Sequence, residues 1–424
     1  MEKRSIKNIE IIKPTPNLLV VLSVVYFFFS YFEKFLPGFI GSCTKYLIFV
    51  LAILFLYFYK WKIRLTTYTL FIVLWLAFKV ISISWSNFSN TDVSRLFVSQ
   101  IGMVFLLCAL CGEVHDSFLL KTYVLSNYLI SFLFGILTLL FHKSYVSEVY
   151  VARQVLTLFG QQNDPNNCTA FLGVGIAIAA YSLIAERKNK ILNIIVILVN
   201  SCGIVLSASR TGFLLLAAIA FVLIFLPNKD QNFVLGSFIK KIVIVSILLF
   251  IGIWTMYRFL PLASIKRLLA FDEYSGGSGR TEKWAEALNL IIQRPIFGWG
   301  WGGYFVGEGI VHNTYLTILC DIGFFGFMLF MIPLCKLIYQ LIKNKYLLPL
   351  LILLTGIFPA IFIDSINKRY FWNAIILGIM MLESFQVNGK YITVWDSDDV
   401  DNDIDEAVEH KVEESDVKKG KRYA

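Results

Sequence analysis

Long apolar runs separated by short polar stretches extend along nearly the whole chain, and they restrict its fold more than any other feature. Many of them approach the ~20 residues that cross the hydrocarbon core of a bilayer as a helix. Hydrophobic residues make up 57% of the 424 residues and charged residues only 16%, whereas a soluble domain is about 25% charged. Backbone groups inside lipid must be satisfied within helices or a closed barrel, and these runs lack the alternation of barrel strands. The sequence therefore predicts an all-α polytopic membrane protein.

The apolar runs predict about 12 transmembrane helices. Basic residues gather in every second loop, for example at 60–64, 187–190 and 343–345, and only the turn at 113–116 departs from this pattern. Because lysine and arginine in short loops stay cytoplasmic, we expect both termini inside the cell. The basic N-terminus leads into an apolar run without a small-residue cleavage site, which predicts an uncleaved anchor. The predicted spans cover residues 18–31, 40–59, 65–83, 96–111, 119–141, 169–185, 191–206, 211–226, 242–260, 315–342, 346–363 and 370–385.

The last residues differ in composition from the rest. Residues 396–424 are acidic at first and end in a basic cluster, which predicts a disordered cytoplasmic tail after a membrane domain of residues 1–395. A calcium loop that began at Asp399 would need a glycine where Ile404 stands. The four histidines lack metal-ligand spacing, and the cysteines, including Cys108 and Cys111 with redox-motif spacing, lie mostly in or beside apolar runs as expected for buried thiols, so we expect no metal and no cofactor. The net charge of +9 follows from the basic inside loops and does not indicate nucleic-acid binding.

One polar stretch, residues 275–321, concentrates arginines, glycines and a histidine between apolar runs. It is a candidate site, since packing in a membrane gives no reason to gather such residues. In the predicted orientation, residues 261–313 form a large outward-facing loop before the tenth helix. Residues 281–293 predict an amphipathic helix on the membrane surface that stops before Pro295. The run from Gly298 to Gly303 predicts a tight turn or a close backbone approach to a ligand.

Three predicted helices begin on the outer side with residue types that cap helix N-termini. These residues are Asn163 and Asp164, then Ser209, then Asn313. A helix N-terminus carries free N–H groups and the positive end of the helix dipole, and both favour an anion. Arg210 and Arg280 add fixed positive charge, and their forked donors suit phosphate oxygens.

Each of these features also has a structural interpretation. Arg210 could extend from a helix end to lipid head groups, Arg280 could be an ordinary loop residue, and His312 could satisfy hydrogen bonds at the membrane interface. Lys79 and Asp321 lie in or near apolar spans, where ionisable groups are functional candidates but where interhelical pairing is an equal alternative.

Several short motifs follow one another in a fixed order on the predicted outer side. They are Phe159-Gly160 with residues 163–166, Ser207-Ala-Ser-Arg-Thr-Gly212, Gly279-Arg280 with Trp284, Arg294-Pro-Ile-Phe-Gly-Trp-Gly300, His312-Asn313 with Tyr315 and Leu316, and Asp321-Ile-Gly-Phe-Phe-Gly326. In order and spacing they resemble the O-antigen ligase and polysaccharide polymerase superfamily. The resemblance covers the second half of the chain, whereas the first five spans agree with the family only in hydropathy.

This resemblance implies a GT-C-like glycosyltransferase of the bacterial cytoplasmic membrane, inverting and metal-independent, with a glycan on undecaprenyl pyrophosphate as donor. By this likeness Arg210 and Arg280 hold the pyrophosphate, and His312 takes the proton from the acceptor hydroxyl. The chemistry agrees, because fixed arginines stabilise charge that develops on a leaving group and disfavour the charged form of a nearby histidine base. The other positions that the likeness and the caps mark as substrate-binding are Ser209, Asn313, Tyr315, Asn163, Asp164, Arg294 and Asp364.

The members of this superfamily differ in their acceptor. A polymerase transfers the growing chain to another lipid-linked repeat unit, whereas a ligase transfers it to lipid A core or to a protein hydroxyl. We favour a polymerase for capsule, exopolysaccharide or O-antigen, which would work beside a flippase and a chain-length regulator. The alternatives are a ligase and, in another class, a polysaccharide transporter. Against the transporter, the chain shows no matching halves and its polar stretch lies outside the membrane midplane.

Overall fold

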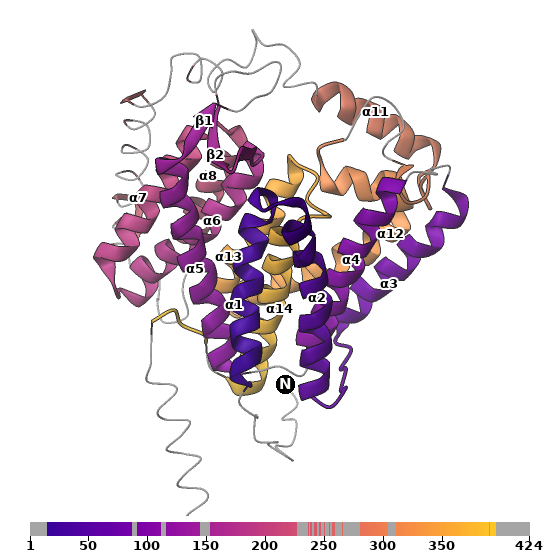
Figure 1. Ribbon diagram of the computed structural model, residues 1–424, viewed down its shortest axis with the longest axis horizontal. Helices are drawn as coiled ribbons and strands as arrows, with labels where there is room; N and C mark the ends of the chain where they lie inside the picture. Colours follow the sequence, from indigo (N-terminus) through magenta and orange to yellow (C-terminus); the bar gives the residue numbers. More distant parts are fainter. Residues whose placement is uncertain are drawn as a thin grey trace, which may run out of the picture.

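The computed structural model describes residues 15–86, 91–111, 116–144, 153–226, 280–303, 311–389 and 391–395, with scattered positions between 236 and 265. These residues form a bundle of helices, with a small sheet and one short helix at the same end (Figure 1). We call this end the hairpin face. The opposite end, where the first helix begins and the last one ends, is called the tail face.

Among the described residues, eleven helices make up the bundle, and a twelfth, α11 (Arg280–Gln293), lies at the hairpin face. The bundle helices are α1 (Asn17–Phe32), α2 (Gly38–Phe58), α3 (Thr67–Ile81), α4 (Thr91–Leu110), α5 (Ser117–Leu140), α6 (Pro165–Tyr181), α7 (Lys190–Leu206), α8 (Arg210–Phe225), α12 (Thr314–Lys343), α13 (Leu347–Ile357) and α14 (Arg369–Asn388). Short helical turns extend four of them: η1 (Glu33–Phe35), η2 (Ser82–Trp85), η3 (Ser182–Glu186) and η6 (Pro359–Ile361).

The predicted helical membrane architecture is confirmed, because seven helices in the described part of the chain are long and apolar enough to cross a membrane. Four more apolar helices are shorter: Val98–Leu110, Lys190–Leu206, Arg210–Phe225 and Leu347–Ile361. Each of them coincides with a predicted span. Most of the ninth predicted span at 242–260 and most of the loop before residue 280 lie outside the described residues, as does the tail at 396–424. The count of twelve spans and the extent of that loop therefore stay predictions.

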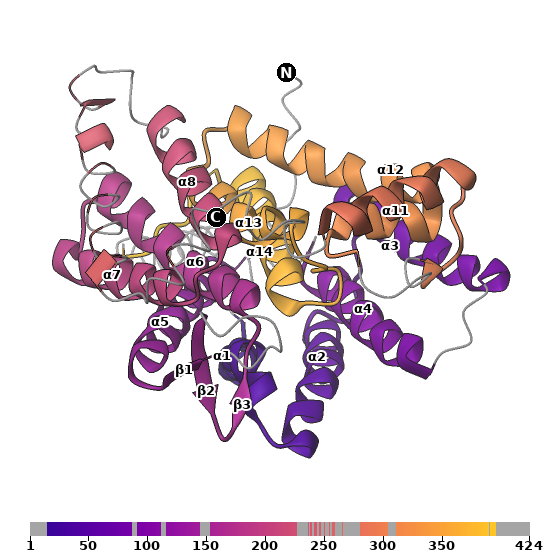
Figure 2. The same cartoon turned by 90° about the horizontal axis from the view of Figure 1, so that it is seen from above.

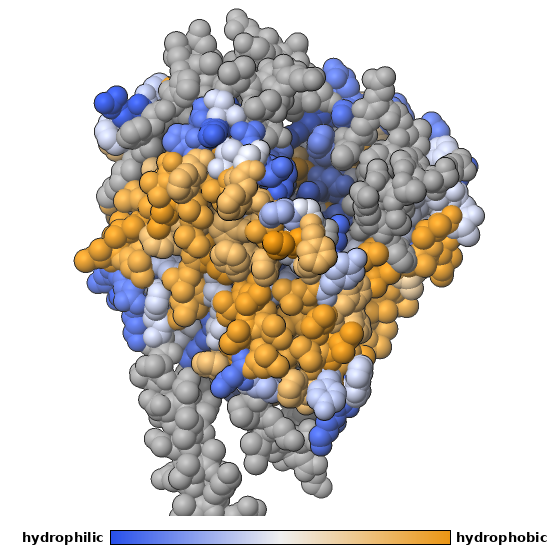
Figure 3. All heavy atoms as spheres, viewed as in Figure 1, coloured by the Kyte–Doolittle hydropathy of each residue, from blue (hydrophilic) through white to orange (hydrophobic). Residues whose placement is uncertain are grey.

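Helices α6, α13 and α14 occupy the middle of the bundle (Figure 2). Every residue of α6 is buried, and its many small residues let its neighbours approach closely. Polar side chains bridge the helices there: the Asn200 amide on α7 donates to the Ser131 hydroxyl of α5 and to the Leu172 carbonyl of α6, over 3.1 and 3.3 Å. Around this centre, apolar side chains form a belt at mid-height, while hydrophilic residues gather toward both faces (Figure 3).

A three-stranded antiparallel sheet on the hairpin face was not predicted from the sequence. Its strands are β1 (His142–Ser144), β2 (Gln154–Leu158) and β3 (Gln161–Gln162), in the order β1-β2-β3. The β2–β3 connection consists of Phe159 and Gly160 with φ of 50° and 76°, as two-residue hairpin turns require. The sheet matters for the site because β3 leads directly into the residues that begin α6.

Candidate active site

The N-termini of α6 and α8 lie together at the hairpin face. Asp164 caps α6: its carboxylate accepts from the amides of Asn166 and Asn167 over 2.8 and 3.2 Å. Ser209 caps α8, and its hydroxyl donates to the Asn166 side-chain oxygen over 2.7 Å. This hydrogen bond places Arg210, the first residue of α8, beside the start of α6. Both caps agree with the prediction made from the sequence.

The caps also change which groups can bind an anion at this face. In α12 the Asn313 side-chain oxygen accepts from the amides of Tyr315 and Leu316 over 2.9 and 3.1 Å. Ser209 accepts from the Gly212 amide in the same way. Because these caps already use the N–H groups that sequence analysis expected to be free, they leave fewer backbone donors for a bound anion. Binding of an anion therefore depends mainly on the arginines.

Arg280 is the first residue of α11, and it is half-buried near the two helix starts. Burial lowers the pKa of its guanidinium. Asp164 opposes this shift and Arg210 reinforces it, so both charges lie within electrostatic reach of Arg280. Two arginines from separate elements thus converge beside one carboxylate. An anion with two or more charges would relieve their mutual repulsion.

His312 lies directly before the Asn313 cap, with a left-handed backbone at φ 55°. Its half-buried ring has a lowered pKa, first because of burial and then because of Arg280 and Lys283, while Asp164 acts in the opposite direction. The imidazole is therefore neutral around neutral pH and free to accept a proton. A hydrogen bond of 3.1 Å from the Trp284 indole to the Val311 carbonyl ties the backbone next to His312 to α11.

The structure therefore brings Arg210, Arg280, His312 and Asp164 into one electrostatic neighbourhood, although they come from four separate elements. Asn163 is buried behind Asp164, whose amide donates to its side-chain oxygen over 2.9 Å. Lys283, which lowers the pKa of His312, also belongs to this neighbourhood and was not predicted from the sequence. The sequence did contain a signal: Lys283 follows Arg280 by three residues, and residues three apart on a helix are neighbours on its surface.

Asp364 lies on the loop before α14, close to the start of α12. The Thr314 hydroxyl donates to the Ile363 carbonyl over 2.9 Å and accepts from the Ser365 amide over 2.7 Å, so both neighbours of Asp364 are fixed. Burial raises the pKa of the Asp364 carboxyl, and the nearby Lys79 opposes the shift. The Tyr315 side chain is half-buried, and its hydroxyl donates to the Ile357 carbonyl over 2.9 Å.

Arg294 is separated from the other predicted site residues. It follows the last residue of α11, whereas Arg280 begins that helix, and a helix of this length places them about 20 Å apart. Its guanidinium lies over the Trp299 ring at 4.1 Å from the centroid, and the side chain is exposed. This cation–π contact at the end of α11 gives Arg294 a structural partner away from His312.

Comparison with known proteins gives two matches. Residues 194–331 match the family model described as O-antigen ligase. A curated protein named ComP-specific O-oligosaccharyltransferase, from Acinetobacter baylyi, is 26% identical over 208 residues. That alignment covers 43% of this chain and 35% of the relative, so the chain spans about a third of the length of the relative. The family match contains Arg210, Arg280 and His312, whereas Asp164 and Asp364 lie outside it.

Proposed function

From its membership of the O-antigen ligase and polysaccharide polymerase superfamily, we propose that this chain is a membrane glycosyltransferase that uses a glycan on undecaprenyl pyrophosphate as donor. The acceptor hydroxyl belongs to another lipid-linked repeat unit, and the product is a longer polysaccharide. The reaction takes place at the hairpin face, which is the outer face of the cytoplasmic membrane in this proposal. The observation that carries the proposal is the convergence of Arg210, Arg280 and the neutral His312.

The chemistry follows from these charges. His312 takes the proton of the acceptor hydroxyl, whose oxygen attacks the anomeric carbon while the bond from that carbon to the pyrophosphate oxygen breaks. Attack opposite the leaving group inverts the anomeric configuration. Negative charge grows on the departing pyrophosphate, where Arg210 and Arg280 stabilise it from fixed positions. Because the arginines supply this positive charge, we propose a metal-independent reaction, and a chelator should leave the rate unchanged.

A second candidate function is a ligase. It is favoured by the printed descriptions of both matches, an O-antigen ligase and an O-oligosaccharyltransferase, neither of which names a polymerase. In that case the acceptor is lipid A core or a protein hydroxyl, while the donor half of the site works in the same way. The two candidates therefore differ only in the acceptor that must be supplied to the purified protein.

The test is transfer by the purified protein in liposomes that contain labelled lipid-linked repeat units. Longer chains without any other acceptor support the polymerase, whereas products that require added lipid A core or protein identify the ligase. We expect Arg210→Ala and Arg280→Ala to abolish transfer, with little rescue by lysine because a point charge cannot replace the fork. Arg294→Ala is the matched control and should transfer normally. Movement of glycan without bond formation would instead identify a transporter.

A further inference from the structure

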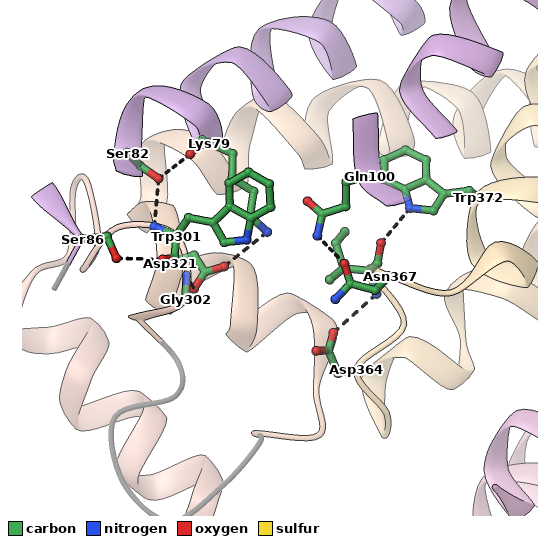
Figure 4. Close-up of polar contacts among 11 residues, drawn as sticks. Lys79, Ser82, Ser86, Gln100, Trp301, Gly302, Asp321, Asp364, Asn367 and Trp372 are labelled. Atoms are coloured by element: carbon green, nitrogen blue, oxygen red, sulfur yellow. Dashed lines mark hydrogen bonds and ion pairs between the residues drawn. The ribbon is translucent and has the colours of Figure 1, made fainter. Parts of the chain in front are cut away.

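A buried ion pair joins α3 to the first part of α12. The Lys79 ammonium lies 3.3 Å from the Asp321 carboxylate, and the two side chains are 1% and 0% exposed. The Trp301 ring covers the ammonium at 5.0 Å, and the Gly302 amide donates to the Asp321 carboxylate over 3.1 Å (Figure 4). We call Lys79, Asp321, Trp301 and Gly302 the Lys79 clamp. It confirms the interhelical alternative considered for Lys79 and Asp321.

The clamp sits beside a break in α12. Gly323 has φ 63° and ψ −169°, so the helix hydrogen bonds across it cannot form. In a continuous helix the amides of Phe324 and Phe325 would donate to the carbonyls of Cys320 and Asp321. Here those two amides donate to the carbonyls of Pro295 and Ile296 over 2.7 and 3.1 Å.

The two carbonyls that the break releases are satisfied by the same segment. The amides of Trp299 and Gly300 donate to the carbonyls of Cys320 and Asp321 over 2.9 and 2.8 Å. Residues 295–300, which follow α11, therefore fill the break in α12 and satisfy both sides of it. The glycines make this possible: a Cβ on Gly298 would lie 2.6 Å from the Asp321 carbonyl. The sequence predicted a tight turn or a close backbone approach to a ligand for Gly298–Gly303, whereas here Gly298 and Gly300 approach the chain itself, at α12 and at the end of α3.

The inserted segment is also attached to the end of α3. The Trp301 amide donates to the Ser82 hydroxyl over 3.0 Å, and the Ser86 hydroxyl donates to the Trp301 carbonyl over 2.8 Å. Together with Lys79, these contacts fix the C-terminal end of α11 to both α3 and α12. The other end of α11 carries Arg280, and Trp284 connects that end to the backbone beside His312.

A buried charge pair stabilises a protein no more than apolar side chains of similar volume would. Removal of one partner is costly, however, because the other charge stays buried. We propose that Lys79 is a positioning residue for glycan transfer: through Asp321 and Trp301 it fixes α11 and the first part of α12, and so holds Arg280 and His312 in register with Arg210. Lys79 touches neither substrate nor the reacting atoms. This inference rests on the proposed function, and it assigns a role to a residue outside the segment that matches the family model.

The test compares Lys79→Met, Asp321→Asn and the double variant by hydrogen exchange of the α11 amides and by transfer rate. Each single variant removes one charge of the ion pair and keeps the other one buried, so exchange in α11 and in residues 295–303 should rise. Transfer should fall by roughly 10²-fold, as expected when reacting groups are displaced by about 1 Å. The double variant carries neither charge of the pair and keeps an acceptor for the Gly302 amide. It should regain both α11 protection and most of the transfer rate.

Glu33→Gln is the control, because Glu33, in η1 after α1, forms another ion pair, with Arg369 of α14 at 2.6 Å, in which Arg369 is buried and Glu33 is half-exposed. It should leave α11 exchange unchanged. The proposal is overturned if α11 stays protected in both single variants, or if α11 loses protection while transfer is unaffected. It is also overturned if the double variant is protected yet inactive. Exchange is measured without substrate, so a wild-type protein that transfers nothing would refute the proposed function and leave the clamp measurable.

Discussion

At the residue scale, His312 combines a left-handed backbone conformation with a side chain whose pKa is lowered. A non-glycine residue at φ 55° occupies a sparsely populated conformation, and such strain persists where the surrounding structure fixes it. The Asn313 cap on one side and the Trp284 hydrogen bond to Val311 on the other provide that fixation. Its half-buried imidazole is therefore held in place next to Arg280 before any substrate arrives.

If His312 is the general base, His312→Ala should slow transfer by roughly 10²- to 10⁴-fold. His312→Gln should be nearly as slow, because glutamine keeps a hydrogen-bonding shape but cannot take the proton. Both variants should still bind the donor through Arg210 and Arg280, which a titration with labelled lipid-linked glycan would measure. A glutamine variant with substantial activity and the wild-type pH profile would restrict His312 to acceptor binding.

The pH profile offers a test at a residue away from the reacting atoms. Lys283 lowers the pKa of His312, so Lys283→Gln should raise it. A base is active only when neutral, and activity is lost as pH falls through its pKa. The acidic limb of the transfer rate should therefore move to higher pH in this variant, with the same rate as wild type on the alkaline side. A limb that stays in place, or moves to lower pH, would show that His312 does not control it.

The caps show which residue roles can be predicted from sequence. Asp164, Ser209 and Asn313 act within three residues of their own position, so residue type and the start of an apolar run are sufficient. The position of Arg294 was not predictable in this way. It depends on the length of α11 and on the Trp299 ring, which a motif alone does not reveal.

At the scale of elements, the break in α12 is the feature that sequence analysis missed. A glycine between Asp321 and Phe325 is compatible with an uninterrupted helix, and the tenth span was predicted as one. The break forms because residues 295–300 supply hydrogen-bond partners from a distant part of the chain. The sheet escaped prediction for a similar reason, since strands of two to five residues carry too little periodicity.

Gly323→Ala tests whether this break is required. Its φ and ψ belong to a region open almost only to glycine, which costs other residues roughly 1–3 kcal/mol. An added Cβ would also collide with the Ile296 carbonyl, so the inserted segment would have to move. We expect a lower thermal unfolding midpoint and loss of transfer. Gly38→Ala is the control, because nothing lies within 4 Å of its added Cβ. Equal stability of the two variants would mean that α12 tolerates a continuous helix.

At the scale of the whole molecule, the helices could be predicted because lipid demands long apolar segments, whereas their arrangement could not. The site depends on the proximity of α6, α8, α11 and α12, which hydropathy does not encode. At the tail face, residues 391–395 pack against the helix bundle. The Ile392 amide donates to the Tyr346 hydroxyl over 2.8 Å, and the Trp395 ring packs edge-on against Tyr128.

These contacts define where the chain can be shortened. A chain that ends after Asp396 should keep its stability and transfer rate, since the contacts of residues 391–395 are kept and, in the proposed orientation, the site lies across a hydrocarbon core of about 30 Å from Trp395. A chain that ends after Gly389 should unfold at a lower temperature, because it loses the packing of Trp395 against Tyr128. It also loses two hydrogen bonds, from the Ile392 amide to Tyr346 and from the Val394 amide to the Glu186 carboxylate over 2.6 Å. Thermal unfolding and transfer in liposomes, measured on both chains, separate the two effects. If the longer of the two were stably folded but unable to form the glycosidic bond, residues 397–424 would have to reach the site, and the proposed orientation of the molecule in the membrane would be wrong.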